Sequence, residues 1–228
     1  MPSSFYDAIP VVLTAVMALH PRSVLDMGIG FGKYGLLFRE YLDMNRQTNG
    51  GLPFDSRGRR VRIDGIEAFE PYVSDLQRAI YDTIYSGEAQ AVLPDLDPYD
   101  LVFMADVLEH LSKADGRILL TQALAKANGG VLVVTPAIHF DQGPVFGNPY
   151  EVHRSFWTPA DFAGYSNVDV LVWRRCLLAY LSRDGKRGRF PRPTLREAMG
   201  IAFRVCLGKL IGELRGEIFR HRLSAGRR

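Results

Sequence analysis

The stretch that decides the fold is SVLDMGIGFG at residues 23–32, a short apolar strand pattern that runs into three alternating glycines. Residues 33–42 follow with apolar side chains at helical spacing, so a strand, a glycine turn and a helix succeed one another. Glycine lets a backbone turn tightly and approach a ligand without a Cβ in the way. The following helix offers unpaired N–H groups to a carboxylate or phosphate. We therefore expect a ligand site at the end of this strand.

The spacing of the glycines separates three kinds of ligand loop. A phosphate-binding P-loop needs Gly-Lys-Ser/Thr, but Lys33 is followed by Tyr34. A dinucleotide loop needs glycine or alanine at the sixth position from Gly28, and that position is also Lys33. The third kind has an acidic residue two positions before the first glycine, here Asp26. A carboxylate there can accept from an ammonium group while the glycine backbone lines a small zwitterion, which suits S-adenosylmethionine (SAM).

Acidic or small residues also follow the next three predicted strands. Glu67 ends the second, where a carboxylate can accept from both hydroxyls of a ribose. Glu88 and Ala89 follow the third, where Glu88 can accept from an adenine amino group, and Asp106 follows the fourth. Ligands of open α/β sheets bind at the carboxyl ends of the strands, so we expect one cofactor site. The predicted cofactor-binding residues are Asp26, Gly28, Gly30, Glu67, Glu88, Ala89 and Asp106.

Helix and strand patterns alternate through residue 135, which predicts βαβ units and a parallel sheet. Residues 45–60 are polar and contain Asn-Gly-Gly, so we expect a mobile insertion there, and a second Asn-Gly-Gly at 128–130 is expected to end a helix. Residues 136–157 lack periodicity, and a loop of this length in a compact domain is usually functional or mobile. The predicted strands are 23–27, 61–67, 83–86, 100–104, 131–135, 168–173 and 177–181, and the predicted helices are 8–19, 33–42, 71–81 and 112–127.

These motifs resemble those of class I SAM-dependent methyltransferases. The resemblance is carried by LDMGIGFG (25–32), GIEAFEPY (65–72), SGEA (86–89), YDLVFMADVLEHL (99–111) and GGVLVVTP (129–136). It is closest to a bacterial and archaeal subgroup with an acceptor segment like GNPYEVHRSFWTPADF (147–162), although Glu replaces Asp at positions 67 and 88. The resemblance implies a Rossmann-like α/β fold whose seven-stranded, mostly parallel sheet has the order 3-2-1-4-5-7-6, with strand 7 antiparallel and helices on its flanks. It also implies SAM contacts at the residues above, from Asp26 to Ala89.

Asp106, Glu109 and His110 project from one face if their stretch is helical. His153 lies in the acceptor segment, and His139 is another candidate. Three interpretations are open. Glu109 and His110 can hydrogen-bond to backbone around the cofactor pocket, as in many similar methyltransferases that have an EHL segment and no metal. His110 or His153 can be a general base for a hydroxyl or amine acceptor. Asp106, Glu109, His110 and His153 can also hold Mg²⁺, Mn²⁺ or Fe²⁺ that binds vicinal hydroxyls, which resembles small-RNA 2′-O-methyltransferases and ubiquinone-pathway O-methyltransferases.

The acceptor segment carries a cluster of aromatic residues beside His153. Aromatic side chains with a few polar groups suit stacking on a sugar or another ring. Phe156 and Trp157 can instead fill the core beneath the segment. The aromatic residues are Phe146, Tyr150, Phe156 and Trp157.

Composition limits the class of protein. The 228 residues are 47% hydrophobic and 23% charged, a globular balance. Cys176 and Cys206 cannot form a disulfide framework, and neither is expected at the ligand edge of the sheet, so no cysteine-mediated mechanism is predicted. Residues 8–19 lack the flanks of a signal peptide, and no segment reaches the ~18 apolar residues of a membrane-spanning helix. We expect a cytoplasmic protein.

Charge divides the chain into a methyltransferase domain, residues 1–182, and a basic linker with an amphipathic helical tail, residues 183–228. The tail holds 13 Lys and Arg against 4 Asp and Glu, whereas the domain holds 15 against 21. Three partners are open for the tail: the domain or a second subunit in a homodimer, the anionic inner face of a membrane, or nucleic acid. The acidic domain disfavours nucleic acid.

The sequence thus predicts an enzyme that transfers a methyl group from SAM to a hydroxyl of a small molecule, a glycan or a glycolipid precursor. An RNA 2′-O-methyltransferase with a divalent metal is the alternative enzyme. A non-catalytic SAM-binding subunit is the alternative outside catalysis. We expect Asp106, Glu109, His110 and His153 to form the reactive side, where the protein mainly aligns the acceptor and excludes water.

Overall fold

The computed structural model describes residues 5–43, 59–183, 185 and 190. They belong to one compact unit that runs to Phe190, whose side chain is buried in the core. The expectations for residues 45–58 and for the helical tail after residue 190 fall outside the described residues. In the part of the chain that is described, no helix has the length and apolar character needed to cross a membrane.

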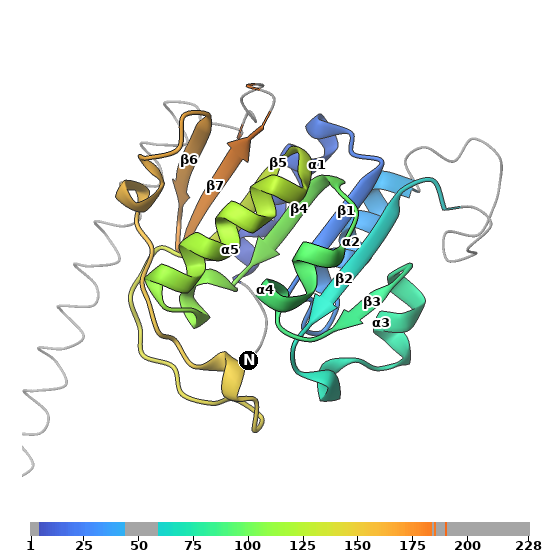
Figure 1. Cartoon of the computed structure of the whole chain (residues 1–228), viewed down its shortest axis with the longest axis horizontal. Helices are drawn as coiled ribbons and strands as arrows, with labels where there is room; N and C mark the ends of the chain where they lie inside the picture. Colours follow the sequence, from blue (N-terminus) through green and yellow to red (C-terminus); the bar gives the residue numbers. More distant parts are fainter. Residues whose placement is uncertain (1–4, 44–58, 184, 186–189, 191–228) are drawn as a thin grey trace, which may run out of the picture. The chain divides into compact units, whose positions relative to one another are not determined.

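Among the described residues, seven strands form one sheet in the predicted order β3-β2-β1-β4-β5-β7-β6 (Figure 1). The first five strands pair in parallel, and β7 is antiparallel to both of its neighbours, as expected. The central strands are near-continuous apolar runs because helices cover both faces of a parallel sheet. The strands are β1 (Ser23–Met27), β2 (Arg62–Glu67), β3 (Ile84–Ser86), β4 (Tyr99–Ala105), β5 (Ala127–Pro136), β6 (Val168–Trp173) and β7 (Cys176–Ser182).

Helices divide between the two faces of the sheet, and each face has its own hydrophobic core cluster. One cluster includes side chains of α1 (Ile9–Leu19), α2 (Lys33–Phe38) and the end of α3 (Asp75–Ile80). The other includes α5 (Lys113–Lys126), with α4 (Ala89–Val92) packed beside it (Figure 1). The glycine turn joins β1 to α2, so the ligand edge of the sheet faces the start of that helix.

Two predicted boundaries are wrong. The helix predicted at 71–81 begins only at Asp75, because Ser74 caps it: the Ser74 hydroxyl accepts from Leu76 N, and Gln77 Oε1 accepts from Ser74 N. Residues 128–130 do not end α5, since β5 begins at Ala127, directly after the helix. Glycine is needed there for strand packing, because a Cβ at Gly130 would lie 2.5 Å from the Leu181 carbonyl oxygen of β7.

Candidate functional site

The glycine turn after β1 adopts a conformation that other residues rarely take. Gly28, Gly30 and Gly32 have φ of +71°, +50° and +78°. Gly28 N donates to the Ile66 carbonyl oxygen at 2.9 Å, which ties the turn to β2. A Cβ at Gly28 would lie 2.8 Å from Val107 Cγ2. Both the backbone conformation and the available space therefore require glycine at position 28.

Asp26 lies in β1 under this turn and is 3% exposed. Its Oδ2 accepts a hydrogen bond from the Tyr81 hydroxyl at 2.7 Å. Tyr81 reaches this position because a glycine stands at position 35, where a Cβ would overlap the tyrosine ring. Burial raises the pKa of Asp26 to about 7, against the opposing effect of the Tyr81 hydrogen bond. A cation placed beside Asp26 would favour the charged carboxylate.

Glu67 at the end of β2 holds the glycine turn in place. Its Oε2 accepts from Gly30 N and its Oε1 accepts from Phe69 N, both at 2.9 Å. Each carboxylate oxygen keeps acceptor capacity for a further donor. Burial raises the pKa of Glu67 as well. After β3, Glu88 is exposed, and its Oε1 lies 3.4 Å from the Tyr150 hydroxyl of the acceptor segment.

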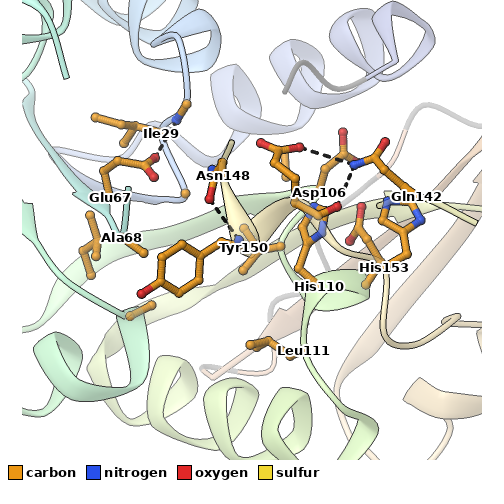
Figure 2. Close-up of a pocket in the computed structure, with 18 of the residues that line it drawn as sticks. Ile29, Glu67, Ala68, Asp106, His110, Leu111, Gln142, Asn148, Tyr150 and His153 are labelled. Carbon is orange, nitrogen blue, oxygen red and sulfur yellow. Dashed lines mark hydrogen bonds between the residues drawn. The ribbon is translucent and has the colours of Figure 1, made fainter. Parts of the chain in front are cut away.

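All ten predicted site residues line one cavity of about 760 Å³. Figure 2 shows Glu67 and Ala68 at one side of this cavity and His110 and His153 at the other. The strand ends therefore bring the candidate cofactor residues and the candidate reactive residues into a single space. Those ten residues are Asp26, Gly28, Gly30, Glu67, Glu88, Ala89, Asp106, Glu109, His110 and His153.

The expectation that Asp106, Glu109 and His110 share a helical face is wrong. Asp106 has φ of +54°, and the backbone then forms a 3₁₀ turn over Leu108–His110. This tight turn still brings the carboxyl groups of Asp106 and Glu109 together. Burial, followed by the Asp106 charge, raises the pKa of Glu109 well above its usual range.

Glu109 is 2% exposed and has one carboxylate oxygen without a partner. Its Oε2 accepts from the Thr135 hydroxyl at 3.1 Å, whereas its Oε1 is buried and makes no hydrogen bond. The Glu109 carbonyl oxygen accepts from Arg154 N at 2.7 Å and from Ser155 N at 3.0 Å. Glu109 thus anchors the acceptor segment through its backbone, and its buried carboxyl group lies beside that of Asp106.

His110 and His153 face each other with ring centroids 5.0 Å apart. His110 Nδ1 lies 3.3 Å from the Val152 carbonyl oxygen, and His153 Nδ1 lies 3.0 Å from that of Phe140. A carbonyl oxygen at Nδ1 requires the N–H there, so each Nε2 keeps its lone pair. Burial lowers the pKa of His110 to about 4 and also lowers the pKa of His153, so both rings are neutral at pH 7.

Glu109, His110 and His153 each offer one possible ligand atom, and these three atoms lie within 4.8 Å of one another. This spacing is compatible with a metal ion. Asp106 is not part of this group. The structure therefore assembles three of the four predicted metal ligands, while the fourth meets the carboxyl group of Glu109.

The N-terminal segment also lines the cavity, and no sequence pattern pointed to this position. Phe5 and Arg175 line the cavity, and Phe5 also packs against Phe140 with ring centroids 6.2 Å apart. Asp7 accepts from Arg174 at 3.0 Å and from Arg175 at 2.9 Å, which pins this segment to the turn between β6 and β7. The ion pairs join residues that are more than 160 positions apart, so a local pattern could not reveal them.

The aromatic residues of the acceptor segment have different roles. Trp157 is 1% exposed and belongs to the core cluster, as in the second of its two interpretations. Phe156 and His139 line a smaller adjoining cavity of about 360 Å³. Tyr150 lines the main cavity.

The expectation that no cysteine lies at the ligand edge of the sheet is wrong for Cys176, and Cys206 lies outside the described residues. Cys176 begins β7 and pairs with Pro136 at the end of β5. Because β7 is antiparallel, its first residue lies at the edge where the parallel strands end. Burial, followed by the Asp106 charge, raises the pKa of Cys176 to about 12, so the thiol is a poor nucleophile.

No family model and no curated protein matches the sequence. Several solved structures share the fold. A DhpI–SAH complex has 17% identity and a TM-score of 0.54 over 76% of this chain and 82% of that chain. The N-terminal domain of EvdMO1 with SAH bound has 17% identity and a TM-score of 0.53 over 82% of each chain. The methyltransferase domain of bacterial CtHen1 has 15% identity and a TM-score of 0.52 over 77% of this chain and 96% of that chain. The chain therefore has the class I methyltransferase fold.

Proposed function

We propose that this chain is a SAM-dependent methyltransferase that acts on a hydroxyl group of a small molecule. One observation carries the proposal: the glycine turn, Asp26 and Glu67 converge on a cavity whose other side holds Glu109 and two neutral histidines. The fold neighbours solved with SAH support the same cofactor class.

The residues of the cofactor side fit the parts of SAM. The Asp26 carboxylate would accept from the ammonium group, and the remaining acceptor capacity of Glu67 would take the ribose hydroxyls. Gly28 lets the backbone approach the ligand, and Glu88 would accept from the adenine amino group. SAM supplies a methyl group on a sulfonium, so the leaving group is already activated.

The chain's task on the reactive side is to align an acceptor hydroxyl, remove its proton and exclude water. Either neutral histidine can accept that proton at Nε2, because each Nδ1 is committed to a carbonyl oxygen. The acceptor segment covers this side: its backbone is bound to the Glu109 carbonyl oxygen, and the Trp157 indole N–H donates to the Leu108 carbonyl oxygen at 3.1 Å.

A divalent metal fits the same residues. Glu109, His110 and His153 can each offer one ligand atom, and this mixed oxygen and nitrogen donor set suits Mg²⁺, Mn²⁺ or Fe²⁺. The Nδ1 contacts to carbonyl oxygens are the outer contacts that usually orient metal-binding histidines. A metal there would act as a Lewis acid that makes an acceptor hydroxyl easier to deprotonate.

We propose a sugar-like hydroxyl as the acceptor, free or in a glycan or glycolipid precursor. The aromatic and polar lining of the acceptor side supports this proposal, and an EvdMO1 domain has been solved with SAH and D-fucose. An RNA acceptor would instead give binding with a steep salt dependence.

For the basic tail we propose contact with an anionic membrane or a second subunit. Sedimentation with anionic liposomes, comparing the full chain with one that ends at residue 190, tests the membrane contact.

Calorimetry and labelling test the proposed function. The purified chain should bind SAH and should not bind NAD⁺, because the glycine spacing does not suit a dinucleotide. Label from methyl-labelled SAM should then enter the small-molecule or glycan fraction of a cell lysate. Binding of NAD⁺ in place of SAH would refute the proposal. Binding of SAH with no transfer to any fraction would favour a non-catalytic subunit, and label in RNA would favour the RNA enzyme.

A further inference from the structure

Tyr34, the second residue of α2, has a buried hydroxyl with no protein partner. The residue is 5% exposed and lines the main cavity. Its Oη is buried and makes no hydrogen bond. An unpaired buried hydroxyl is unfavourable, so its presence needs a reason other than the stability of the free chain.

The Tyr34 ring is fixed on the face of the sheet that carries Asp26. It packs edge-on against Phe103 with ring centroids 4.8 Å apart, and its centroid lies 5.9 Å from that of Phe38. Phe103 of β4 is the in-register neighbour of Asp26 in β1. In-register neighbours on adjacent strands point to the same face. The unpaired hydroxyl therefore lies on the Asp26 side of the cavity.

Tyr34 and Tyr81 both belong to the core cluster on this face of the sheet, and they differ in one respect. The Tyr81 hydroxyl is paired with the Asp26 carboxylate, whereas the Tyr34 hydroxyl has no partner. Burial and the charges of Asp106, Cys176 and Asp26 raise the pKa of Tyr34, so its phenol stays protonated and remains a donor. Among the described residues that line the cavity, the other buried side-chain atom without a partner is Glu109 Oε1, whose carboxyl group lies beside Asp106.

We propose that the Tyr34 hydroxyl donates a hydrogen bond to the α-carboxylate of SAM. The inference rests on the proposed function, which places the ammonium group of SAM at Asp26. The ammonium and the carboxylate share one carbon atom, so a donor for the carboxylate must lie on the same side of the cavity. Tyr34 meets this requirement with a hydroxyl that has no other use in the structure.

The cationic side chains that line the cavity are less suitable for this carboxylate. Burial lowers the pKa of Lys33 against the opposing charge of Asp106, and Arg175 forms an ion pair with Asp7 at 2.9 Å. Arg154 also lines the adjoining cavity, together with His139, His153 and Phe156. The carboxylate is therefore left to the neutral donor beside Asp26.

The substitution Tyr34→Phe tests the inference, with SAM and decarboxylated SAM as two ligands that differ only in the carboxylate. We expect about 10- to 100-fold weaker binding of SAM, the range for a hydrogen bond to a charged group, and no change for decarboxylated SAM. We also expect an unchanged or higher melting temperature of the free chain, because the variant removes an unpaired hydroxyl. Isothermal titration calorimetry and thermal unfolding measure these effects.

Tyr99→Phe is the matched control. The Tyr99 hydroxyl donates to Asp64 Oδ2 at 2.6 Å at the start of β4, the opposite end of the strand from the site. This variant should lower the melting temperature and leave both affinities unchanged. If Tyr34→Phe weakened both ligands equally, or neither, the assignment would be wrong while the proposed function stood. If the wild-type chain bound neither ligand, both would be wrong.

Discussion

The two sides of the cavity are built from different kinds of contact. On the cofactor side, Glu67 is held by the backbone of Gly30 and Phe69, and Asp26 is held by Tyr81. On the reactive side, the His110 ring is held by the Val152 carbonyl oxygen and the His153 ring by that of Phe140, while Glu109 Oε1 has no donor.

This difference separates a preformed binding surface from a set of reactive atoms. The cofactor carboxylates already have protein donors, so a ligand there adds contacts to a rigid turn. The candidate reactive residues depend on contacts with loop residues between 136 and 157 for their position. Substitutions on the cofactor side should therefore change the affinity for SAH, and substitutions on the reactive side should change the affinity for a metal ion.

The largest effect is expected from Asp26→Asn. The variant removes the charge that would bind the ammonium group, so SAH affinity should fall about 100-fold by calorimetry. Binding of Mn²⁺ should not change, because the ligand cluster lies on the other side of the cavity. An equal loss of both affinities would show that the two sides act as one unit.

The converse variant is His153→Ala. It removes one nitrogen donor, so Mn²⁺ affinity should fall at least about 10-fold while SAH affinity stays within about twofold of wild type. Titration of the metal-free chain, followed by SAH titration of the same sample, gives both numbers. His139→Ala is the control, because His139 lines the adjoining cavity and is outside the cluster. If the wild-type chain bound no metal, the general-base interpretation would replace the metal.

The pH dependence of binding should come from the cofactor side. The pKa of Asp26 is about 7 in the folded chain, and the ligand ammonium needs the charged carboxylate. SAH affinity should therefore fall about 10-fold from pH 8 to pH 6, and Asp26→Asn should remove most of this slope. Calorimetry in two buffers of different ionisation enthalpy would detect the proton that binding releases from Asp26. A flat profile for the wild type would contradict the assigned role of Asp26.

The same group has an opposite effect on the stability of the free chain. The folded pKa of Asp26 lies above its ordinary value of 3.8, so the folded chain keeps a proton that the unfolded chain releases. The contribution of Asp26 to stability is therefore full below about pH 4 and is lost as the pH rises toward 7. Ligand binding should restore stability in that range.

The smallest effect is expected when one glycine on each side of the cavity is replaced by alanine. Gly28→Ala should destabilise the chain by about 1–3 kcal/mol, because an alanine there is strained and would meet Val107. Gly147→Ala in the acceptor segment has a similar φ of +75° but nothing within 4 Å, so it measures the backbone strain alone. Denaturant unfolding should show a larger loss for Gly28→Ala, and equal losses would mean that the contact with Val107 is unimportant.

Local sequence predicted that the glycine turn and the acidic strand ends line one cavity, because their positions follow from strand order. The glycine turn, the strand ends and the acidic residues at 26 and 67 all follow from apolar runs and their breaks. For the other side of the cavity, the sequence predicted which residues line it but not their geometry. Asp106 has a left-handed backbone, and the expected helix is a 3₁₀ turn. Tyr34 and Tyr81 were missed because no motif marks a tyrosine that is buried on the face of the sheet that carries Asp26.

The amino-acid sequence by itself determined the order of strands and helices, the glycine turn and the acidic strand ends. These follow from hydrophobic periodicity and from backbone conformations that only certain residues tolerate. Only the tertiary structure decided which atoms remain unpaired, that Cys176 lies at the ligand edge, and that Asp7 pins the N-terminal segment beside the acceptor side. The physical reason is distance along the chain: hydrogen bonds and burial depend on residues that folding brings together from separate segments, and no local pattern records them.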